Sequence, residues 1–155
     1  MKYKRQFKSR KGNALIEFAL SAPLLFTVLG GSFQFGYVFY VYNQLQLSVR
    51  SGVRYASVMD YAGTSAGCRA VTEDMAKNVV VYGTPTPAGD ARPIVPGLST
   101  SNVSVGFNPD AKGVPTDVTM TITGFSVNAL FTTFNFTGKP WATVPYVGRF
   151  AKDCE

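Results

Sequence analysis

A single carboxylate stands near the start of a long apolar segment, and its position suggests chemistry more than that of any other residue in this chain. Glu17 is the only charged residue between Ala14 and Tyr42. A charged side chain inside a membrane segment is energetically costly and is usually kept for a function. The sequence therefore marks Glu17 as a functional candidate and predicts that the segment around it lies in lipid.

The residues that usually perform catalysis are missing or scattered. The chain has no histidine, which is the commonest general base and a common metal ligand. Cys68 and Cys154 lie too far apart to form a zinc-binding motif, and no phosphate-binding glycine loop or nucleophile elbow is present. Adjacent acids such as Glu73 and Asp74 diverge on a helix and are usually solvated. We therefore expect a protein that is not an enzyme and uses no cofactor or metal ion.

The positive charge is concentrated at the N-terminus. The net charge of +6 comes from 15 basic and nine acidic residues, and six of the basic residues precede Gly12: Lys2, Lys4, Arg5, Lys8, Arg10 and Lys11. A basic arm can bind nucleic acid. The apolar segment directly behind it instead favours a cytoplasmic N-terminus under the positive-inside rule. We therefore predict an exported C-terminal part and no nucleic-acid partner.

Residues 13–42 are predicted to form a transmembrane helix. Its apolar part would span about 43 Å, whereas a bilayer has a hydrocarbon core of about 30 Å. Counted from Leu15, about 30 Å of helix ends at Phe35, where aromatic residues cluster. They form an outer interfacial belt, the aromatic core of an exported domain, or both. Pro23 and Gly30-Gly31 are either tolerated in a membrane helix or make a bendable stem.

The residues around Glu17 resemble the processing site of type IV prepilins. The sequence Gly-Asn-Ala-Leu-Ile-Glu-Phe runs from Gly12 to Phe18. The longer stretch to Leu25, which ends in Ser-Ala-Pro-Leu-Leu, is similar to the TadE-like pseudopilins of tight-adherence pilus systems. The similarity continues through an Arg-Tyr-Ala sequence that ends at Ala56.

This resemblance implies a processed membrane protein. Residues 1–12 would be a leader that a prepilin peptidase removes after Gly12, which leaves Asn13 as the new N-terminus; Phe18 would belong to the processing motif. The protein would be a minor pilin or pseudopilin of a tight-adherence (Flp-type) pilus, an adhesion system. It would be held in the bacterial inner membrane with its C-terminal domain in the periplasm. Its partners would be other pilins, contacted through their stem helices, and the inner-membrane assembly platform.

Two other accounts compete with this one. A cleaved secretory signal that ends at Ala22 has the right outline, but the apolar run continues far beyond it and Pro23 is a poor residue to follow the cut. The second account is an uncleaved single-pass anchor that displays a small extracytoplasmic binding domain.

Cleavage after Gly12 would give Glu17 a specific partner. The new α-amino group of Asn13 is largely protonated at neutral pH and lies about 6 Å from Glu17 along the helix axis. A staggered neighbouring subunit would place its amino group against this carboxylate, and the pair is far less costly in lipid than two separate charges. The resemblance to pilins carries this role to Glu17. The alternative is a lone glutamate that stabilises the helix N-terminus near the headgroups.

Residues 43–155 are predicted to form one small exported domain of the α+β class. In this pilin-like fold, the long N-terminal helix packs on a small antiparallel sheet. The helix is expected to continue to about Met59, with one apolar face made of Leu45, Val49, Val53 and Ala56. A second helix is predicted over 65–82, with an apolar stripe that includes Cys68, Val71 and Val79.

The remainder of the domain is predicted to be a loop followed by strands. Four prolines over 83–96 indicate an irregular exposed loop. Alternating residues predict three strands within 102–150, near 103–107, 118–122 and 141–150. Pro145 places the last of them at a sheet edge. The segment 125–136 lacks a clear period and is predicted to be a loop packed on the sheet.

The two cysteines suggest a covalent link across the domain. In an exported domain, an even number of cysteines indicates a disulfide. Such a bond between Cys68 and Cys154 would tie the start of the domain to the end of the chain. Two free thiols are the alternative, which a reducing compartment would favour.

Overall fold

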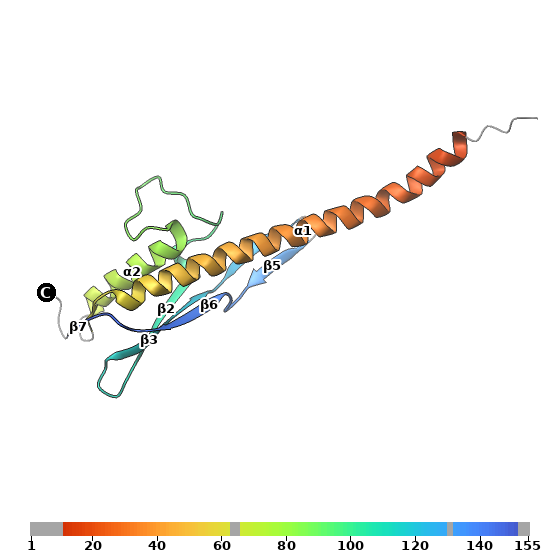
Figure 1. Cartoon of the computed structure of the whole chain (residues 1–155). Helices are drawn as coiled ribbons and strands as arrows, with labels where there is room; N and C mark the ends of the chain where they lie inside the picture. Colours follow the sequence, from red (N-terminus) through yellow and green to blue (C-terminus); the bar gives the residue numbers. More distant parts are fainter. Residues whose placement is uncertain (1–10, 63–65, 130–131, 152–155) are drawn as a thin grey trace, which may run out of the picture.

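The structure, a computed structural model, describes residues 11–62, 66–129 and 132–151. Its elements are α1 (Lys11–Val58), β1 (Tyr61–Ala62), α2 (Ala66–Tyr82), the 3₁₀ helix η1 (Thr100–Asn102), β2 (Val103–Pro109), β3 (Pro115–Ile122), β4 (Phe125–Asn128), β5 (Thr133–Phe136), β6 (Trp141–Pro145) and β7 (Phe150–Ala151). A long N-terminal helix packs on a small antiparallel sheet, as Figure 1 shows, which confirms the predicted α+β, pilin-like fold class.

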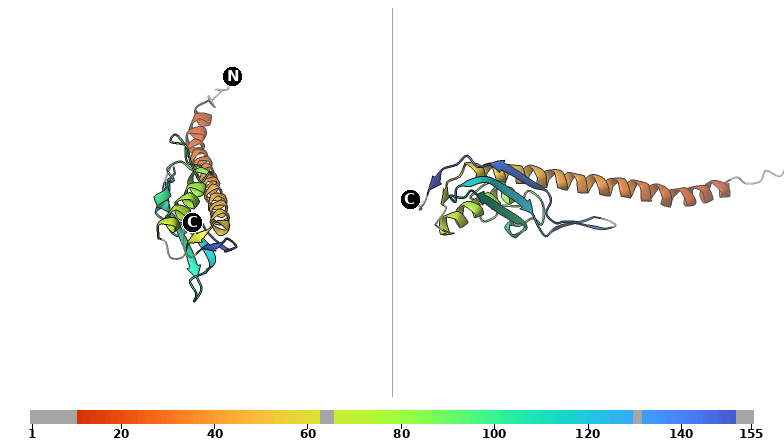
Figure 2. Two further views of the ribbon diagram at one scale, coloured as in Figure 1. Left: turned by 90° about the vertical axis from the view of Figure 1, so that its left-hand side faces the viewer. Right: turned by 90° about the horizontal axis from the view of Figure 1, so that it is seen from below.

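The helix α1 is one continuous rod of 48 residues, about 72 Å long at 1.5 Å per residue. Its N-terminal half projects away from the other elements, whereas its C-terminal half packs against α2 and the sheet (Figures 1 and 2). Pro23 does not end the helix, although it lacks the N–H that would bond to Ala19. The Thr27 hydroxyl donates a hydrogen bond to the Pro23 carbonyl, at 2.8 Å. The predicted end near Met59 differs from the observed end by one residue.

The C-terminal half of α1 supplies the centre of the hydrophobic core. The apolar face predicted from the four-residue spacing is fully buried, as Leu45, Val49, Val53 and Ala56. Arg50 and Arg54 are exposed on other sides of the helix. The period of the sequence therefore predicts which face of α1 meets the domain.

The helix α2 occupies Ala66–Tyr82, where the sequence predicts a helix over 65–82. The predicted apolar stripe is partly wrong: Val79 is buried, but Val71 is 55 % exposed. The buried face is centred on Ala76 and Val80 instead. Ala76 has a small side chain and lies opposite Gly52 of α1, so the two helices are in close contact there. Close packing at these small residues has decided the rotation of α2.

The main sheet has three antiparallel strands in the order β2-β3-β6. The central strand β3 buries Val118, Met120 and Ile122 completely. The helix α1 covers β3 and β6, and α2 covers β2 (Figure 1). The opposite face is polar, with the hydroxyls of Thr119 and Thr143 2.7 Å apart. The edge position of β6, which contains Pro145, agrees with the prediction.

Residues 125–136 do not form the predicted loop. The strands β4 and β5 make an antiparallel hairpin in which Phe125 pairs with Phe136 and Val127 with Phe134. Directly paired residues point to the same side of a sheet, so these apolar side chains share one face of the hairpin. The residues between them, such as Ser126 and Asn135, are exposed. Each strand is only four residues long, which is too short for its alternation to stand out in the sequence.

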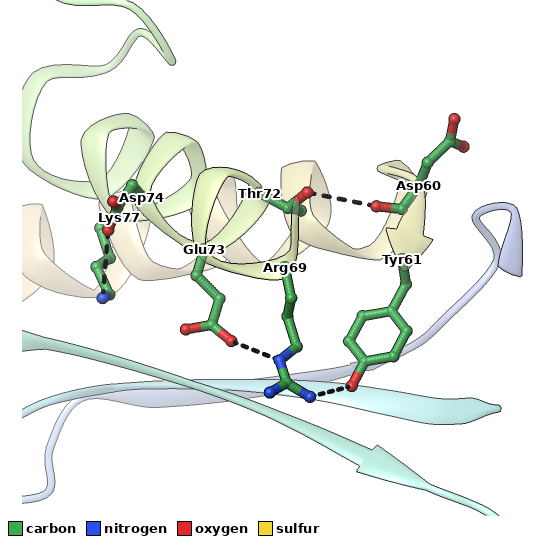
Figure 3. Close-up of polar contacts among 7 residues, drawn as sticks. All are labelled: Asp60, Tyr61, Arg69, Thr72, Glu73, Asp74 and Lys77. Atoms are coloured by element: carbon green, nitrogen blue, oxygen red, sulfur yellow. Dashed lines mark hydrogen bonds and ion pairs between the residues drawn. The ribbon is translucent and has the colours of Figure 1, made fainter. Parts of the chain in front are cut away.

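The end of the chain closes against the end of α1. The predicted third strand is interrupted: β6 ends at Pro145, and β7 pairs in parallel with β1 through Tyr61 and Phe150. Beside this pair, the Arg69 guanidinium of α2 lies between the Tyr61 hydroxyl, at 3.5 Å, and the Glu73 carboxylate, at 3.9 Å (Figure 3). The hydrogen bond to Tyr61 is the main cause that raises the pKa of Arg69. These contacts link the first turns of α2 to the two short strands.

Tyr146 makes a polar link between the end of α1 and the chain before β7, and its replacement by phenylalanine is expected to destabilise the fold by about 1–2 kcal/mol. The Tyr146 hydroxyl lies 2.7 Å from the carbonyl oxygens of both Met59 and Arg149, and donates its one proton to either. Burial raises the pKa of Tyr146 above the ordinary value of 10.0. The neutral Tyr146 hydroxyl therefore contributes its full stabilisation of the fold below about pH 10. This contribution is lost as the pH rises through the raised pKa of Tyr146.

Thermal unfolding of the full chain in detergent, followed by near-ultraviolet circular dichroism, measures this effect. The matched control is Tyr40→Phe, because Tyr40 is exposed and its change should fall within about 0.5 kcal/mol of the parent. Equal stability of Tyr146→Phe and the parent at about pH 7–9, where tyrosine is neutral, would contradict the assigned link.

Candidate functional site

The predicted processing site lies at the free end of the stem, by which we mean residues 12–40 of α1. Gly12 and Asn13 lie in the first turn of α1, and Glu17 and Phe18 lie in the following turn. Gly12 is exposed, and a side chain at this position would meet no atom within 4 Å. The peptide bond after Gly12 is therefore far from the folded domain and has open space around it.

The Glu17 carboxylate has no partner within the described part of the chain. Glu17 is exposed, and among residues 11–62, 66–129 and 132–151 no side chain forms an ion pair or hydrogen bond with it. The neighbouring Phe18 is also exposed, at 70 %. The charge on Glu17 is consequently available to a group outside this part of the molecule.

The surface of the stem is almost entirely apolar. The large hydrophobic side chains of its N-terminal portion are exposed: Leu15, Ile16, Phe18, Leu20, Leu24, Leu25, Phe26, Val28, Leu29 and Phe33. Water-soluble domains rarely expose an apolar surface of this extent. The helix within Ala14–Val58 is long and apolar enough to cross a membrane, and its most apolar stretch is not buried by the protein. These features fit a single-pass membrane protein.

One side of the stem is hollowed next to Pro23. The hollow has a volume of about 460 Å³ and is lined by Phe18, Ser21, Ala22, Leu24, Leu25, Phe26 and Val28. Small residues at its centre, Ser21 and Ala22, are flanked by large ones. In membranes, such small residues let the backbones of two helices approach closely. The stem thus offers a helix-packing surface less than two turns from Glu17.

The aromatic residues beyond the midpoint of the stem differ in their environment. Phe35, Phe39 and Tyr40 are exposed, as expected of an interfacial belt. Tyr42, in contrast, stacks on Phe136 of β5, with ring centroids 6.0 Å apart. Tyr42 therefore belongs to the aromatic core of the domain, and the interfacial belt stays a prediction.

Two features of the junction between stem and domain were not foreseen from the sequence. Gln34 is only 7 % exposed, although most of its neighbours on the stem are exposed. An apolar groove of about 300 Å³ follows it, lined by Phe35, Val38, Phe39, Tyr42, Phe134 and Phe136. The spacing of the four α1 residues indicated a common helix face, but the two from β5 were hidden in the segment predicted as a loop.

The predicted disulfide falls outside the described residues. Cys154 and the side chain of Cys68 are not among them, so the bond is not supported and stays a prediction. The backbone pairing of Ala62 with Ala151 does bring the chain segments that precede both cysteines together. Among the described residues, no three histidine, cysteine, aspartate or glutamate side chains gather to hold a metal ion.

Comparison with known families supports the resemblance seen in the sequence. The family model of TadE-like proteins matches residues 12–54, which confirms the predicted resemblance for the stem and the following helix. The match begins at Gly12 and includes Glu17. No curated protein and no solved structure matches the chain. Residues 12–54 are thus similar to TadE-like proteins.

Proposed function

From this TadE-like N-terminal region, we propose that the chain is a minor pilin or pseudopilin of a tight-adherence pilus and acts in pilus assembly or priming. The observation that carries the proposal is the exposed apolar stem with one unpartnered carboxylate, Glu17, inside the family match. Such a stem is suited to a lipid bilayer first and to contacts with other stems afterwards. The function is associative, and we propose no catalytic activity.

In this proposal, the protein is first inserted into the bacterial inner membrane. The basic leader stays in the cytoplasm, residues 13–42 cross the bilayer, and residues 43–155 lie in the periplasm. A prepilin peptidase cuts after Gly12. The domain then remains tethered through α1 until the assembly platform draws the subunit into a growing fibre or its initiating complex.

Two kinds of contact would hold the assembled stems. The apolar surface, including the hollow next to Pro23, would pack against neighbouring stems. Dispersion and close approach at small residues stabilise such packing in the absence of water. The new amino group of one subunit would meet the Glu17 carboxylate of the next. Apolar contacts alone tolerate many registers, and the charge pair would favour one of them.

The proposed processing predicts the mature N-terminus. When the chain is expressed together with a prepilin peptidase, Edman degradation or intact mass should show a protein that begins at Asn13. Gly12→Leu should block cleavage, because the peptidase would then meet a large side chain directly before the cut. The position is open in the parent, so the subunit itself has space for this side chain. Expression without the peptidase is the control and should give the full chain.

Retention of the leader in the presence of an active peptidase would instead indicate an uncleaved anchor that displays a binding domain. Thiol labelling of the same samples before and after reduction also tests the predicted Cys68–Cys154 bond.

A further inference from the structure

The apolar groove between α1 and the β4–β5 hairpin is open and has no occupant within the described part of the chain. It is lined by Phe35, Val38, Phe39, Tyr42, Phe134 and Phe136. Phe35 and Phe39 are exposed, whereas Phe134 and Phe136 are half-buried. The hairpin lies alongside α1 on the side of the domain that faces the stem (Figure 1). The groove therefore opens where the stem leaves the domain.

The position of the groove along α1 matches the edge of a bilayer. About 30 Å of helix counted from Leu15 reaches Phe35, which is the thickness of the hydrocarbon core. From Phe35 to Tyr42 the helix advances about 10 Å further. The polar headgroup layer on each side of a bilayer is about 5–8 Å thick. The groove thus begins at the acyl chains and extends through the headgroups.

The hairpin has the polarity that this level of a membrane requires. Its apolar face, with Phe134 and Phe136, is turned toward the groove, and its other face carries exposed Ser126 and Asn135. Phe136 stacks between Tyr42 and Phe125, at centroid distances of 6.0 and 6.3 Å. At a membrane surface, an amphipathic element lies in the interfacial layer with its polar face toward water.

The burial of Gln34 agrees with this placement. Its amide lies one residue before Phe35, at the outer edge of the hydrocarbon core, where an exposed polar group would be unfavourable. Gln34 is instead covered by the protein, and it has an interaction partner. The protein therefore shields the Gln34 amide, which would otherwise face lipid at this level.

We infer that the β4–β5 hairpin docks on the membrane surface and that the groove holds lipid acyl chains, so that the domain of the unassembled subunit lies against the bilayer. The groove is continuous with the apolar surface of the stem, which makes lipid the occupant favoured over a second protein chain. The inference rests on the proposed function, because it requires the stem to span the membrane.

The chain offers a direct test because it contains one tryptophan, Trp141. In a Trp141→Phe background, single reporters are introduced as Phe134→Trp in the groove, Phe26→Trp in the stem and Val147→Trp at the far end of the domain. Phe26 and Val147 are both 71 % exposed, so they form matched controls. Each full chain is reconstituted in phosphatidylcholine vesicles that contain lipids spin-labelled near the headgroup or in the middle of the acyl chain. Iodide serves as the quencher in water.

The Phe134→Trp reporter is expected to lose fluorescence with the shallow lipid label as strongly as the Phe26→Trp reporter does with the deep label, and to be shielded from iodide. The Val147→Trp reporter should respond to iodide alone. Quenching of the Phe134→Trp reporter by iodide and not by lipid, with the stem reporter still quenched by lipid, overturns the docking. Protection that disappears when the protein is diluted in lipid also overturns it, since a second copy would then fill the groove.

Absence of lipid quenching at the stem reporter would contradict the proposed membrane span itself, so the two failures are distinguishable. If Phe134→Trp lowers the protease resistance of the domain, Phe136→Trp provides a second reporter in the same groove. Both positions must agree with the shallow lipid label for the inference to stand.

Discussion

Glu17→Gln should lower the incorporation of the subunit into a pilus, or into its initiating complex, by roughly 10- to 100-fold. Glutamine has nearly the same size as glutamate, but it has no charge and replaces one of the two acceptor oxygens with an NH2 donor. The amino group of the neighbouring subunit would then lie in lipid without a counterion. Removing one partner of a buried ion pair costs about 3–5 kcal/mol in proteins, of which the partly hydrated end of a stem would retain only a part. Each 1.4 kcal/mol changes an equilibrium constant about tenfold.

The measurement is co-purification of the mature subunit with its partner pilins, together with the amount found in sheared fibres. Membrane insertion and cleavage after Gly12 should be largely unchanged, because insertion depends on the apolar segment and the cut lies five residues before the substitution. Two controls separate charge from packing. Glu17→Asp keeps the charge and should restore part of the incorporation. Leu20→Ala removes an exposed apolar side chain of the same stem and should have a much smaller effect.

An unchanged yield of Glu17→Gln in fibres, from cells in which the leader has been removed, would rule out the charge pair. Glu17 would then only stabilise the start of α1, since an acidic residue near a helix N-terminus contributes about 0.3–1 kcal/mol.

The sequence predicts the stem well because the stem is governed by local rules. A continuous apolar surface with one charge requires no knowledge of distant residues, and the family match over residues 12–54 covers this same part. The buried face of α1, with Leu45 and Val49, follows from the helical period in the same way. The strand β3 also alternates clearly, because one of its faces is fully buried and the other carries threonines.

The mistakes arise where a distant contact decides the local structure. Val71 belongs to the apolar stripe of α2 by spacing, but Ala76 and Gly52 set how the two helices meet, and this rotates Val71 into solvent. The hairpin of β4 and β5 packs against α1 through Phe136 and Tyr42, which are nearly a hundred residues apart in the chain. The groove could not be predicted for the same reason, since two of its six lining residues belong to this hairpin.

The close contact between the two helices at Gly52 explains the second large expected effect, which is the loss of stability in Gly52→Val. A Cβ atom at position 52 would overlap Val80 Cγ2 and would lie 2.9 Å from Met120 Sδ and 3.2 Å from the Ala76 carbonyl oxygen. Val80 and Met120 are fully buried, so neither has free space to move into. Overfilling a packed core costs about 1–3 kcal/mol and sometimes more. We expect a loss of about 3 kcal/mol for valine and a smaller loss for alanine.

Alanine makes the test sharper because it separates helix propensity from packing. Replacing glycine by alanine inside a helix is favourable by about 1 kcal/mol when space allows, so any loss for Gly52→Ala is a lower limit on the steric cost.

Gly36 provides the matched control: it lies in the same helix, and a Cβ atom there would meet no atom within 4 Å. Gly36→Ala should leave the unfolding transition of the domain unchanged. The transition, followed in detergent by near-ultraviolet circular dichroism and by protease resistance, should fall in temperature in the order parent, Gly52→Ala, Gly52→Val. If both Gly52 variants unfold with the parent, the contact of α1 with α2 and β3 is looser than these distances require, and the rotation of α2 needs another cause.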